Sequence, residues 1–262
     1  MRLFDCHAHT SDLSYCCAPG ITEATYLAAL ARGADLTGIA ITNHGFAIYS
    51  PTREEAFAAE YMRDPALFDR HLAFGNRRLE EHLRRIEGCR AQGLCTGLEV
   101  ELLPDGRLTF DPCFRGRLDV LIGSVHFLPH LEEPGLHPVA ILSKWWEHTE
   151  ALMCSGIDIL GHPFRWLHRN AGLPVTDELL RHLVEKARRF GVALEINAHM
   201  VIPADLELLK ACVAAGVPVA VGSDSHAVEE IGNLDYQRKL IQASGIPAAE
   251  IPLWLPKRLR GG

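Results

Sequence analysis

The sequence predicts an α/β fold in which parallel strands close into a TIM-like barrel of about seven strand–helix units. Most of the expected strands are continuous apolar runs, such as TGIAIT and VPVAVGS, which are typical of strands buried on both faces of a parallel sheet. Helical patterns separate these runs, as crossover connections require. The chain has 262 residues, which suits one barrel domain of roughly 250 residues better than a division into two domains.

Seven strands and several intervening helices can be assigned in order. The expected strands cover 2–6, 36–42, 95–102, 118–125, 157–161, 192–197 and 217–222. Three of the helices have clear end signals, because capping side chains precede them or glycines follow them. These helices are expected to run from Thr22 to Gly33, from Thr176 or Asp177 to Gly191, and across ADLELLKACVAAG to Gly216.

Two longer excursions interrupt this alternation. Residues 46–93 are rich in Arg and Glu and are expected to contain two helices, and residues 128–148 contain Pro, His and a Trp pair. Both follow the C-terminal ends of strands, so both are expected to overhang the mouth of the barrel, where loops shape the active site in such folds. We therefore interpret residues 1–262 as a single barrel domain with a helical insert at about 46–93 over the active-site face.

Charge and composition restrict the partners. The formal net charge is −7 and no basic stripe or arginine-rich run is present, so nucleic acid is not expected as the main partner. No apolar run approaches the roughly 20 residues that cross a bilayer, and Met1 leads into a strand without the pattern of a signal peptide. The eight cysteines form no CxxC pair, so we expect free thiols, a cytoplasmic setting and no membrane partner.

Polar pairs mark the first and the last strand. His7 and His9 are two residues apart, as are Asp224 and His226. In extended chain, residues at this spacing point to the same face of the sheet, so each pair can enter the barrel together. Small polar residues, Ser223 among them, surround the second pair, as a crowded and hydrogen-bonded rim needs.

Other candidates lie within or directly after the remaining strands. Glu99 lies in an otherwise apolar strand, where a buried carboxylate must be paired or bind a metal, whereas Glu101 on the same face is expected to be a solvated strand end. His44, His126 and His162 each end an apolar run. One such histidine would be interpreted as a packing residue, but a barrel brings all these strand ends into one circle. So many buried imidazoles need partners, and metal ions would satisfy them.

The types of ligand predict the type of metal. Imidazole and carboxylate suit Zn, Mn, Fe, Ni or Co better than Ca or Mg alone. Six histidines and two carboxylates exceed the three protein ligands of a typical catalytic zinc, so two or three divalent ions are expected. Their surplus positive charge would attract a phosphate, and paired metals can generate hydroxide and stabilise a displacement at phosphorus.

Residues 5 to 226 contain, in order, the motifs DCHAHT, ITNHG, GLEVE, GSVHF, GHPF, EINAH and GSDSH. Together these motifs resemble the PHP family, named for polymerase and histidinol phosphatase modules. The resemblance implies a distorted (β/α)7 barrel, a di- or trinuclear metal centre and phosphoesterase activity. It also implies one metal held by His7, His9, Glu99 and Asp224, a second held by Glu99 as a bridge with His126 and His162, and a third held by His44 and His226.

Two positions depart from the pattern of this family. Many members have a histidine near the position of Tyr15, where it completes the third metal site, and many have Asp at the position of Asn43. Asn retains a hydrogen-bond acceptor but lacks the charge that would make the neighbouring imidazole more basic. Whether a third metal binds stays open, and the alternative ligands for it are Asp12, Cys16, Cys17 and His199.

These inferences predict a metal-dependent phosphomonoesterase that acts on a small phosphate ester. A hydroxide bridging the metals is expected to attack phosphorus. The expected catalytic residues are Asp224, His226 and His199, and one of the two histidines or a metal-bound water would protonate the leaving group. Arg165 and His199 are the expected substrate contacts, because a guanidinium can donate two parallel hydrogen bonds to phosphate. Histidinol phosphate is one substrate option by resemblance.

Two other functions stay open. An amidohydrolase-like deaminase or lactonase also has an HxH motif on its first strand, but that class tends to end in a lone Asp and often has a lysine on the fourth strand. Here the fourth strand ends in Ser124, Val125 and His126, and Asp224 is followed by His226. The second alternative is a module that binds metal without catalysis.

Overall fold

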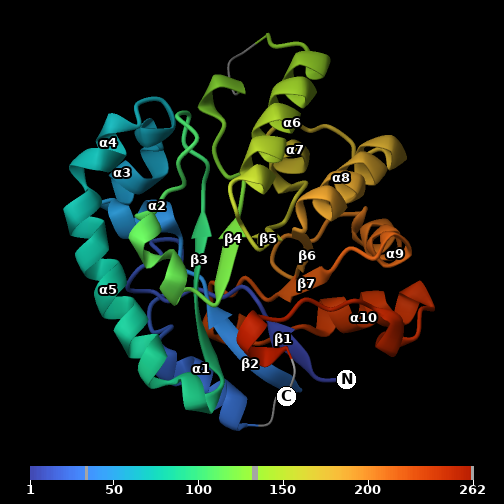
Figure 1. Cartoon of the computed structure of the whole chain (residues 1–262), viewed down its shortest axis with the longest axis horizontal. Coiled ribbons are helices and arrows are strands. Elements are labelled where there is room, and N and C mark those ends of the chain that lie inside the picture. Colours follow the sequence, from blue (N-terminus) through green and yellow to red (C-terminus); the bar gives the residue numbers. More distant parts are fainter. Residues whose placement is uncertain (33–34, 132–134, 261–262) are drawn as a thin grey trace.

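The computed structural model of the chain describes residues 1–32, 35–131 and 135–260. Its centre is one sheet of seven parallel strands that follow one another in chain order (Figure 1). The strands are β1 (Leu3–Asp5), β2 (Leu36–Ile41), β3 (Leu94–Val100), β4 (Val120–Gly123), β5 (Ile159–Leu160), β6 (Ala193–Asn197) and β7 (Val219–Gly222). Each of them falls within or next to a predicted strand, so the predicted α/β class is confirmed.

The sheet curls into a nearly closed barrel because its two edge strands meet. The amide of Cys6, at the end of β1, donates to the carbonyl of Val221 in β7 at 2.9 Å. The amide of Asp224 donates to the carbonyl of His7 at 2.8 Å. The predicted (β/α)7 barrel is therefore confirmed, and the C-terminal ends of all its parallel strands lie at one rim.

Helices connect the strands and cover the outside of the barrel. They are α1 (Glu23–Ala31), α2 (Gly45–Tyr49), α3 (Arg53–Ala58), α4 (Ala66–Arg70), α5 (Leu72–Gly88), α6 (Pro138–Cys154), α7 (Arg165–Arg169), α8 (Asp177–Phe190), α9 (Asp205–Ala215) and α10 (Asp235–Ser244). Single 3-10 turns cover 60–62, 90–92, 112–117, 129–131, 228–230, 248–250 and 257–259. None of the helices in the described ranges is long and apolar enough to cross a membrane.

The predicted ends of α8 and α9 follow the expected capping chemistry, whereas Thr22 precedes α1 without a side-chain cap hydrogen bond. The side chain of Thr176 accepts a hydrogen bond from the amide of Leu179 at 3.2 Å, which satisfies one of the free donors at the start of α8. Gly191 ends α8 with a φ of 70°, and Gly216 ends α9 with a φ of 68°, in the left-handed region that favours glycine. Gly33, the predicted end of the first helix, lies outside the described residues.

The insert after β2 contains more than the two helices predicted for it. Four α-helices, α2 to α5, occupy this region, and the first three have only five or six residues each. Thr52 caps the start of α3, and Ala59 ends it with a φ of 52°. Helices this short complete no apolar repeat of the length that reveals a helix in a sequence, so the pattern showed chiefly α5.

Apolar side chains form a layer inside the barrel beneath the polar rim. This layer comprises Phe4, Cys6, Ala40, Cys95, Val120, Ile122, Ile159, Ala193, Ala220 and Trp254. Because side chains alternate along a strand, Cys95 shares its face with Glu99, and Ala193 shares its face with Glu195. The polar side chains at the rim therefore rest on a dry, packed floor, where each of them needs a partner.

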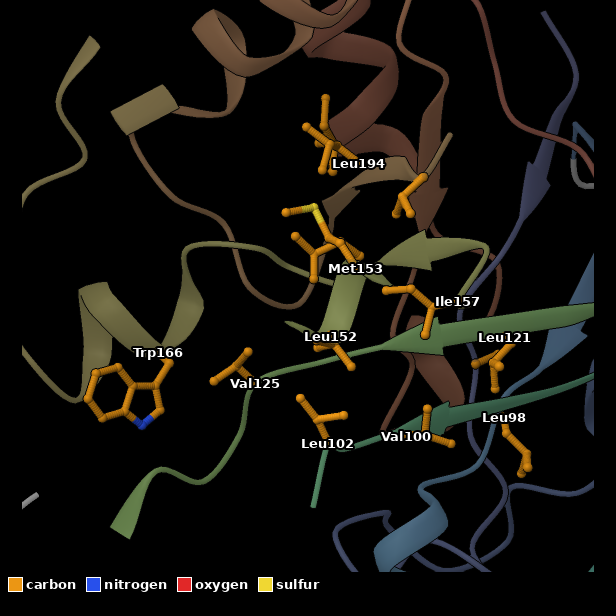
Figure 2. Packing of buried hydrophobic residues seen from close by; sticks show 14 of the residues in the cluster. Leu98, Val100, Leu102, Leu121, Val125, Leu152, Met153, Ile157, Trp166 and Leu194 are labelled. Atoms are coloured by element: carbon orange, nitrogen blue, oxygen red, sulfur yellow. The ribbon is translucent and has the colours of Figure 1, made fainter. Parts of the chain in front are cut away.

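A second, larger apolar core lies between the barrel and its outer helices. Figure 2 shows part of it, with Leu98 and Val100 of β3, Leu121 of β4, and Leu152 and Met153 of α6. All of these side chains are at most 2% exposed. This core fixes the strands against the helices and thereby holds the rim in position.

Close packing within the insert leads to a stability prediction. A Cβ built on Gly75 of α5 would lie 2.0 Å from Cδ1 of Tyr49 in α2. We expect Gly75→Ala to lower the free energy of unfolding by about 1–3 kcal/mol, the usual cost of overpacking. Gly88→Ala in the same helix is the control, since a Cβ there meets no atom within 4 Å. Urea denaturation measures both variants, and equal midpoints would contradict the prediction.

Candidate metal centre

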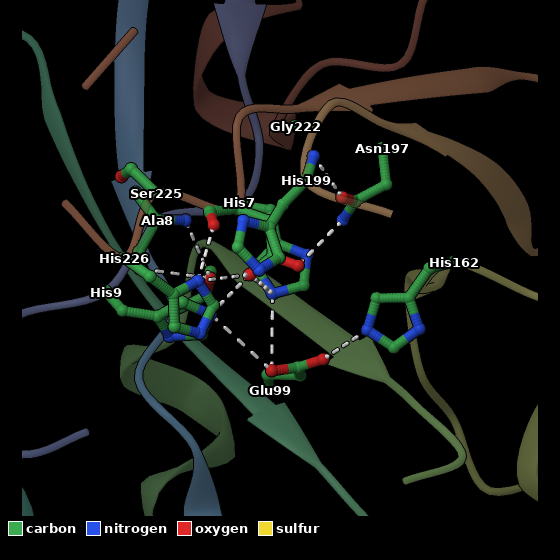
Figure 3. Close-up of polar contacts among 12 residues, drawn as sticks. His7, Ala8, His9, Glu99, His162, Asn197, His199, Gly222, Ser225 and His226 are labelled. Carbon is green, nitrogen blue, oxygen red and sulfur yellow. Dashed lines mark hydrogen bonds and ion pairs between the residues drawn. The ribbon is translucent and has the colours of Figure 1, made fainter. Parts of the chain in front are cut away.

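All eight side chains that the sequence predicted as metal ligands lie together at the C-terminal rim of the barrel. They come from six of the seven strands: His7 and His9 follow β1, His44 follows β2, Glu99 lies in β3, His126 follows β4, His162 follows β5, and Asp224 and His226 follow β7. Figure 3 shows Glu99 facing His7, His9 and His162 across the rim. The barrel thus joins residues from both ends of the chain in one cluster.

Glu99 lies at the centre of this cluster. Its Oε2 is 3.2 Å from Nε2 of His7 and 2.6 Å from Nδ1 of His44. Its Oε1 is 3.0 Å from Nε2 of His162 and 3.4 Å from Nε2 of His126. The two carboxylate oxygens therefore face different sets of imidazoles, an arrangement that suits a carboxylate bridging two cations.

Several groups within the cluster have the spacing of a metal site. Ligand atoms lie within 4.8 Å of one another in each of three sets: His7, His9 and Asp224; His44, Glu99 and His126; and His9, His44 and His226. Four buried atoms in the cluster make no hydrogen bond of suitable geometry with the described residues, although Oε2 of Glu99 lies close to His7 and His44: Nε2 of His7, Nδ1 of His44, Nδ1 of His162 and Oε2 of Glu99. Unpartnered buried nitrogens and oxygens are costly, and divalent transition metals would satisfy them.

The charges in the cluster depend on one another. Burial alone would raise the pKa of Glu99, but the surrounding imidazoles, with His7 foremost, hold the pKa of this carboxyl well below its usual range. Burial acts against ionisation of Asp224 too, and His7 and His9 likewise hold its pKa low. Burial would lower the pKa of His44, but Glu99 raises it to about 10. Burial would lower the pKa of His7 as well, but Glu195 and Glu99 raise it. His7 and His44 thus favour their protonated forms beside the carboxylates when no metal is bound, and a divalent cation can replace those protons.

Glu195 of β6 orients two of the candidate ligands and was not predicted. Its Oε1 accepts a hydrogen bond from Nδ1 of His7 at 2.8 Å, and its Oε2 accepts one from the amide of His162 at 2.7 Å. The first bond leaves Nε2 of His7 free to face Glu99. The signal for Glu195 was present in the sequence, because it is a carboxylate in an apolar strand, the same argument that selected Glu99.

Two further polar residues support the last strand. Nδ2 of Asn197 donates to Oδ2 of Asp224 at 3.1 Å, while its Oδ1 accepts from the amide of His199 at 2.9 Å. Asp5 accepts from the amide of Ser223 at 2.9 Å and from its hydroxyl at 2.6 Å, which joins β1 to β7 beneath the ligands. These bonds fix the direction of Asp224.

The backbone is strained at two of the candidate ligands. His162 has a φ of 26° and Asp224 a φ of 50°, and non-glycine residues adopt such conformations at a cost of about 1–3 kcal/mol. Gly222 precedes this bend, and a Cβ there would lie 2.3 Å from Oε1 of Glu195 and 2.5 Å from Cβ of His7. The chain therefore turns sharply around the centre, with no space for a larger residue at this position.

The prediction that Glu101 is a solvated strand end is wrong. Glu101 is 1% exposed, and its carboxylate accepts hydrogen bonds from Nδ1 and from the amide of His126. Burial raises the pKa of Glu101 well above its usual range. The chain folds back over the strand end, where the amide of Thr109 donates to the carbonyl of Glu101 at 3.0 Å. Strand periodicity cannot reveal a cover supplied by a later segment.

Asn43 braces the turn after the first histidine pair. Its Oδ1 accepts from the amide of Thr10 at 2.7 Å and from the hydroxyl of Ser14 at 2.9 Å. That hydroxyl lies 3.5 Å from Nδ1 of His9. Asn43 therefore acts on the imidazole of His9 through Ser14.

A pocket of about 560 Å³ opens beside the cluster. Its lining comprises Cys16, His44, Phe46, Phe57, His126, Phe127, Arg165, Arg169, Asn170, His199, Met200, Asp224 and His226. Both predicted substrate contacts, Arg165 and His199, are in this lining. The ring of His199 stacks on that of His226 with centroids 4.6 Å apart, and Nε of Arg165 has no hydrogen-bond partner in the described part of the chain.

The role of Glu195 can be tested through metal affinity. We expect Glu195→Gln to weaken metal binding by about 10- to 100-fold, the usual loss when the partner behind a metal-binding histidine is changed. Glutamine keeps the size of the side chain but removes the charge that orients His7. Competition with a chromophoric chelator measures the affinity, and Glu185→Gln on the exposed face of α8 is the control. Equal affinities of the two variants would exclude an orienting role.

The parallel barrel and the buried imidazoles and carboxylates at its rim place the chain in a class of proteins: barrels with a candidate multinuclear metal centre. Within this class, the chain belongs to the PHP domain family, whose model matches residues 5–199. The match covers most of the candidate ligands and ends before Asp224 and His226.

Similar proteins include a polymerase and proteins named as probable phosphatases. The DNA polymerase/3'-5' exonuclease PolX of Bacillus subtilis is 29% identical over 60% of this chain and 27% of its own length. A "Probable phosphatase" of Shewanella loihica is 28% identical over 64% of this chain and 65% of its own length. Another "Probable phosphatase", of Caldicellulosiruptor saccharolyticus, is 27% identical over 84% of this chain and 80% of its own length. The chain thus spans less than two thirds of the first two relatives.

Proposed function

We propose that the protein is a metal-dependent phosphomonoesterase that acts on a small phosphate ester, with two or three divalent ions of Zn, Mn or Fe as cofactors. The observation that carries this proposal is the convergence of imidazoles and carboxylates around Glu99, directly beside the pocket that contains Arg165. Bound ions would leave a positive surplus at the pocket, which favours a phosphate group. The relatives named as phosphatases support the same class of reaction.

The chain's own residues would hold the cofactors rigidly. We assign His7, His9 and Asp224 to one ion, and Glu99 to a bridge toward a second ion at His126 and His162. When bound, the ions would neutralise charge on the phosphoryl oxygens and activate the attacking water. Hydrogen bonds from Asn197 and to Glu195 fix Asp224 and His7 in advance, so little reorganisation is needed during the reaction.

Two pocket residues would act on the substrate. Arg165 would hold the nonbridging oxygens of the phosphate through parallel hydrogen bonds. His199 is better suited than His226 to protonate the leaving group. His226 belongs to three candidate ligand groups, whereas His199 belongs only to an outer one with His226 and Glu230, and a nitrogen that coordinates a metal carries no proton.

We propose that the insert α2–α5 covers the active-site face of a single barrel domain. Phe46 of α2 and Phe57 of α3 line the pocket together with Phe127. The ring centroid of Phe46 lies 6.0 Å from that of Phe57 and 5.3 Å from that of Phe127. Aromatic rings in the same pocket as Arg165 favour a substrate whose leaving group has a flat or apolar part.

The proposed function is tested by turnover assays on metal-loaded protein. Purified chain reconstituted with Zn, Mn or Fe is incubated with a library of phosphomonoesters and with a panel of amides and lactones. Release of inorganic phosphate is expected from at least one small ester. Turnover confined to amides or lactones would instead identify an amidohydrolase-like enzyme, and metal binding without any turnover would identify a binding module.

Arg165 provides a separate prediction about substrate binding. We expect Arg165→Ala to lower kcat/KM by roughly 10- to 100-fold, mainly through KM, because hydrogen bonds to charged groups contribute about 1.5–3 kcal/mol. Steady-state kinetics on the best phosphate ester measure the change. Arg181→Ala, on the exposed surface of α8, is the matched control. Identical kinetics for both variants would remove Arg165 from the phosphate site.

A further inference from the structure

The segment that follows His7 and His9 has no histidine that could complete a third metal site, and its Tyr15 and Asp12 do not take that place. Tyr15 points away from the centre, because its hydroxyl donates to the carbonyl of Ser50 at 3.0 Å. Asp12 is also engaged elsewhere: its Oδ1 accepts from the hydroxyl of Thr10 at 2.6 Å, and its Oδ2 pairs with Arg85 at 2.5 Å. Neither side chain is therefore available to complete the site.

The next residue, Cys16, faces the centre. Its sulfur, the sulfur of Cys17 and a ring nitrogen of His226 all lie within 4.8 Å of one another. Cys16 also lines the same pocket as His44, His226 and Asp224. The amide of Ala18 donates to the carbonyl of His226 at 2.8 Å, so the backbone holds this segment against the end of β7.

The neighbouring imidazoles supply the remaining ligands. His226 belongs both to the group with Cys16 and to the group with His9 and His44, so the two groups share one ligand. The rings of His44 and His226 have centroids 6.1 Å apart, and Nδ1 of His44 faces Oε2 of Glu99 at 2.6 Å, so His44 lies between the proposed two-metal centre and His226. Cys16, His44 and His226 thus line one pocket beside the proposed two-metal centre, with His226 common to both ligand groups.

We propose that the thiolate of Cys16 is a ligand of a third divalent ion, together with His44 and His226. This inference extends the metal centre of the proposed function but does not depend on which substrate is turned over. On binding, the thiol releases its proton to solvent and its sulfur bonds to the ion. A soft sulfur ligand favours Zn, Fe or Co over Mn and Mg, so this ion would differ in preference from those held by imidazole and carboxylate alone.

Cys17 is the natural control for this assignment. Its sulfur also lies within 4.8 Å of the sulfur of Cys16 and a ring nitrogen of His226. Its side chain, however, packs against the apolar core and does not line the pocket. A difference between the two cysteines therefore reports on position and not on thiol content. Cys16→His offers a second comparison, since an imidazole can replace the thiolate as a ligand without sulfur.

The test is titration of the full chain with Co²⁺, read by absorption and by metal analysis. We expect a thiolate-to-cobalt charge-transfer band in the near ultraviolet, which Cys16→Ser abolishes with the loss of about one ion per chain. Cys17→Ser should keep the band and the ion, and Cys16→His should keep the ion without the band.

Several results would overturn the inference. These are no band in the wild type, a band that survives in Cys16→Ser, or a band lost only in Cys17→Ser. Circular dichroism of each variant shows whether it is folded, and retention of the ion by Cys16→His excludes general misfolding as the cause. Because absorption and metal content do not require turnover, failure of the phosphatase assay would leave this result interpretable.

Discussion

Glu99→Gln is expected to abolish turnover, with kcat/KM lowered by about 10³-fold or more, and to remove metal from the centre. Five imidazoles lie within 3.7 Å of the two oxygens of this carboxylate. Glutamine keeps the shape of the side chain, but it replaces the carboxylate, which only accepts hydrogen bonds, with a neutral amide whose N–H groups donate them. Loss of the bound ions would remove several kcal/mol of transition-state stabilisation, and each 1.4 kcal/mol corresponds to about tenfold in rate.

Glu101→Gln is the matched comparison for this prediction. Glu101 lies two residues further along the chain and contacts His126 instead of facing the whole cluster. We expect a smaller loss for this variant, about 10- to 100-fold in metal affinity, because it acts through the orientation of one histidine. Metal analysis and steady-state kinetics measure both variants. Retention of bound metal and of turnover in Glu99→Gln would refute the bridging role of this carboxylate.

Removal of metal by a chelator is expected to destabilise the protein strongly and reversibly. An ion present at 100 times its Kd adds about 2.7 kcal/mol to the free energy of unfolding, so two ions add about 5 kcal/mol. For a domain of this size, that corresponds to a fall in Tm of roughly 10–20 °C. Differential scanning calorimetry before and after chelation, and after addition of Zn or Mn, measures the effect.

The stabilisation of the protein by bound metal should increase with pH. The pKa of His44 is raised to about 10 in the absence of metal, so below that pH this imidazole carries a proton that a metal must displace. Stabilisation by metal should therefore be larger near pH 8 than near pH 6. Glu99→Gln is the control, because its Tm should respond little to the chelator. Equal Tm values of the wild type with and without chelator would show that no ion is bound to the folded state.

The fold was predictable because its signals are local. Continuous apolar runs identified all seven strands, and Thr176, Gly191 and Gly216 marked helix ends through capping chemistry that involves only neighbouring residues. The short helices of the insert were not predictable, because five or six residues complete no apolar repeat. Their positions depend on contacts such as that between Gly75 and Tyr49.

The candidate ligands could be recognised for a topological reason. In a parallel barrel every strand ends at the same rim, so a histidine or acid at a strand end is placed near the others whatever the loops do. This is why His7, Glu99 and Asp224 could be grouped before any distance was known. Glu195 satisfied the same criterion, and a consistent search for carboxylates in apolar strands would have included it.

The sequence by itself determined the barrel, the order of its strands and the residues that converge on its rim. The reason is that the alternation of strands and helices, and the points where strands end, can be recognised from residues that are neighbours in the chain. Tertiary structure alone decided how those residues are oriented and covered. Glu101 is buried since a later segment folds over it, and Cys16 rather than Tyr15 faces the centre since Ser50 binds the tyrosine hydroxyl. Such outcomes depend on contacts between residues distant in the chain, which no local pattern encodes.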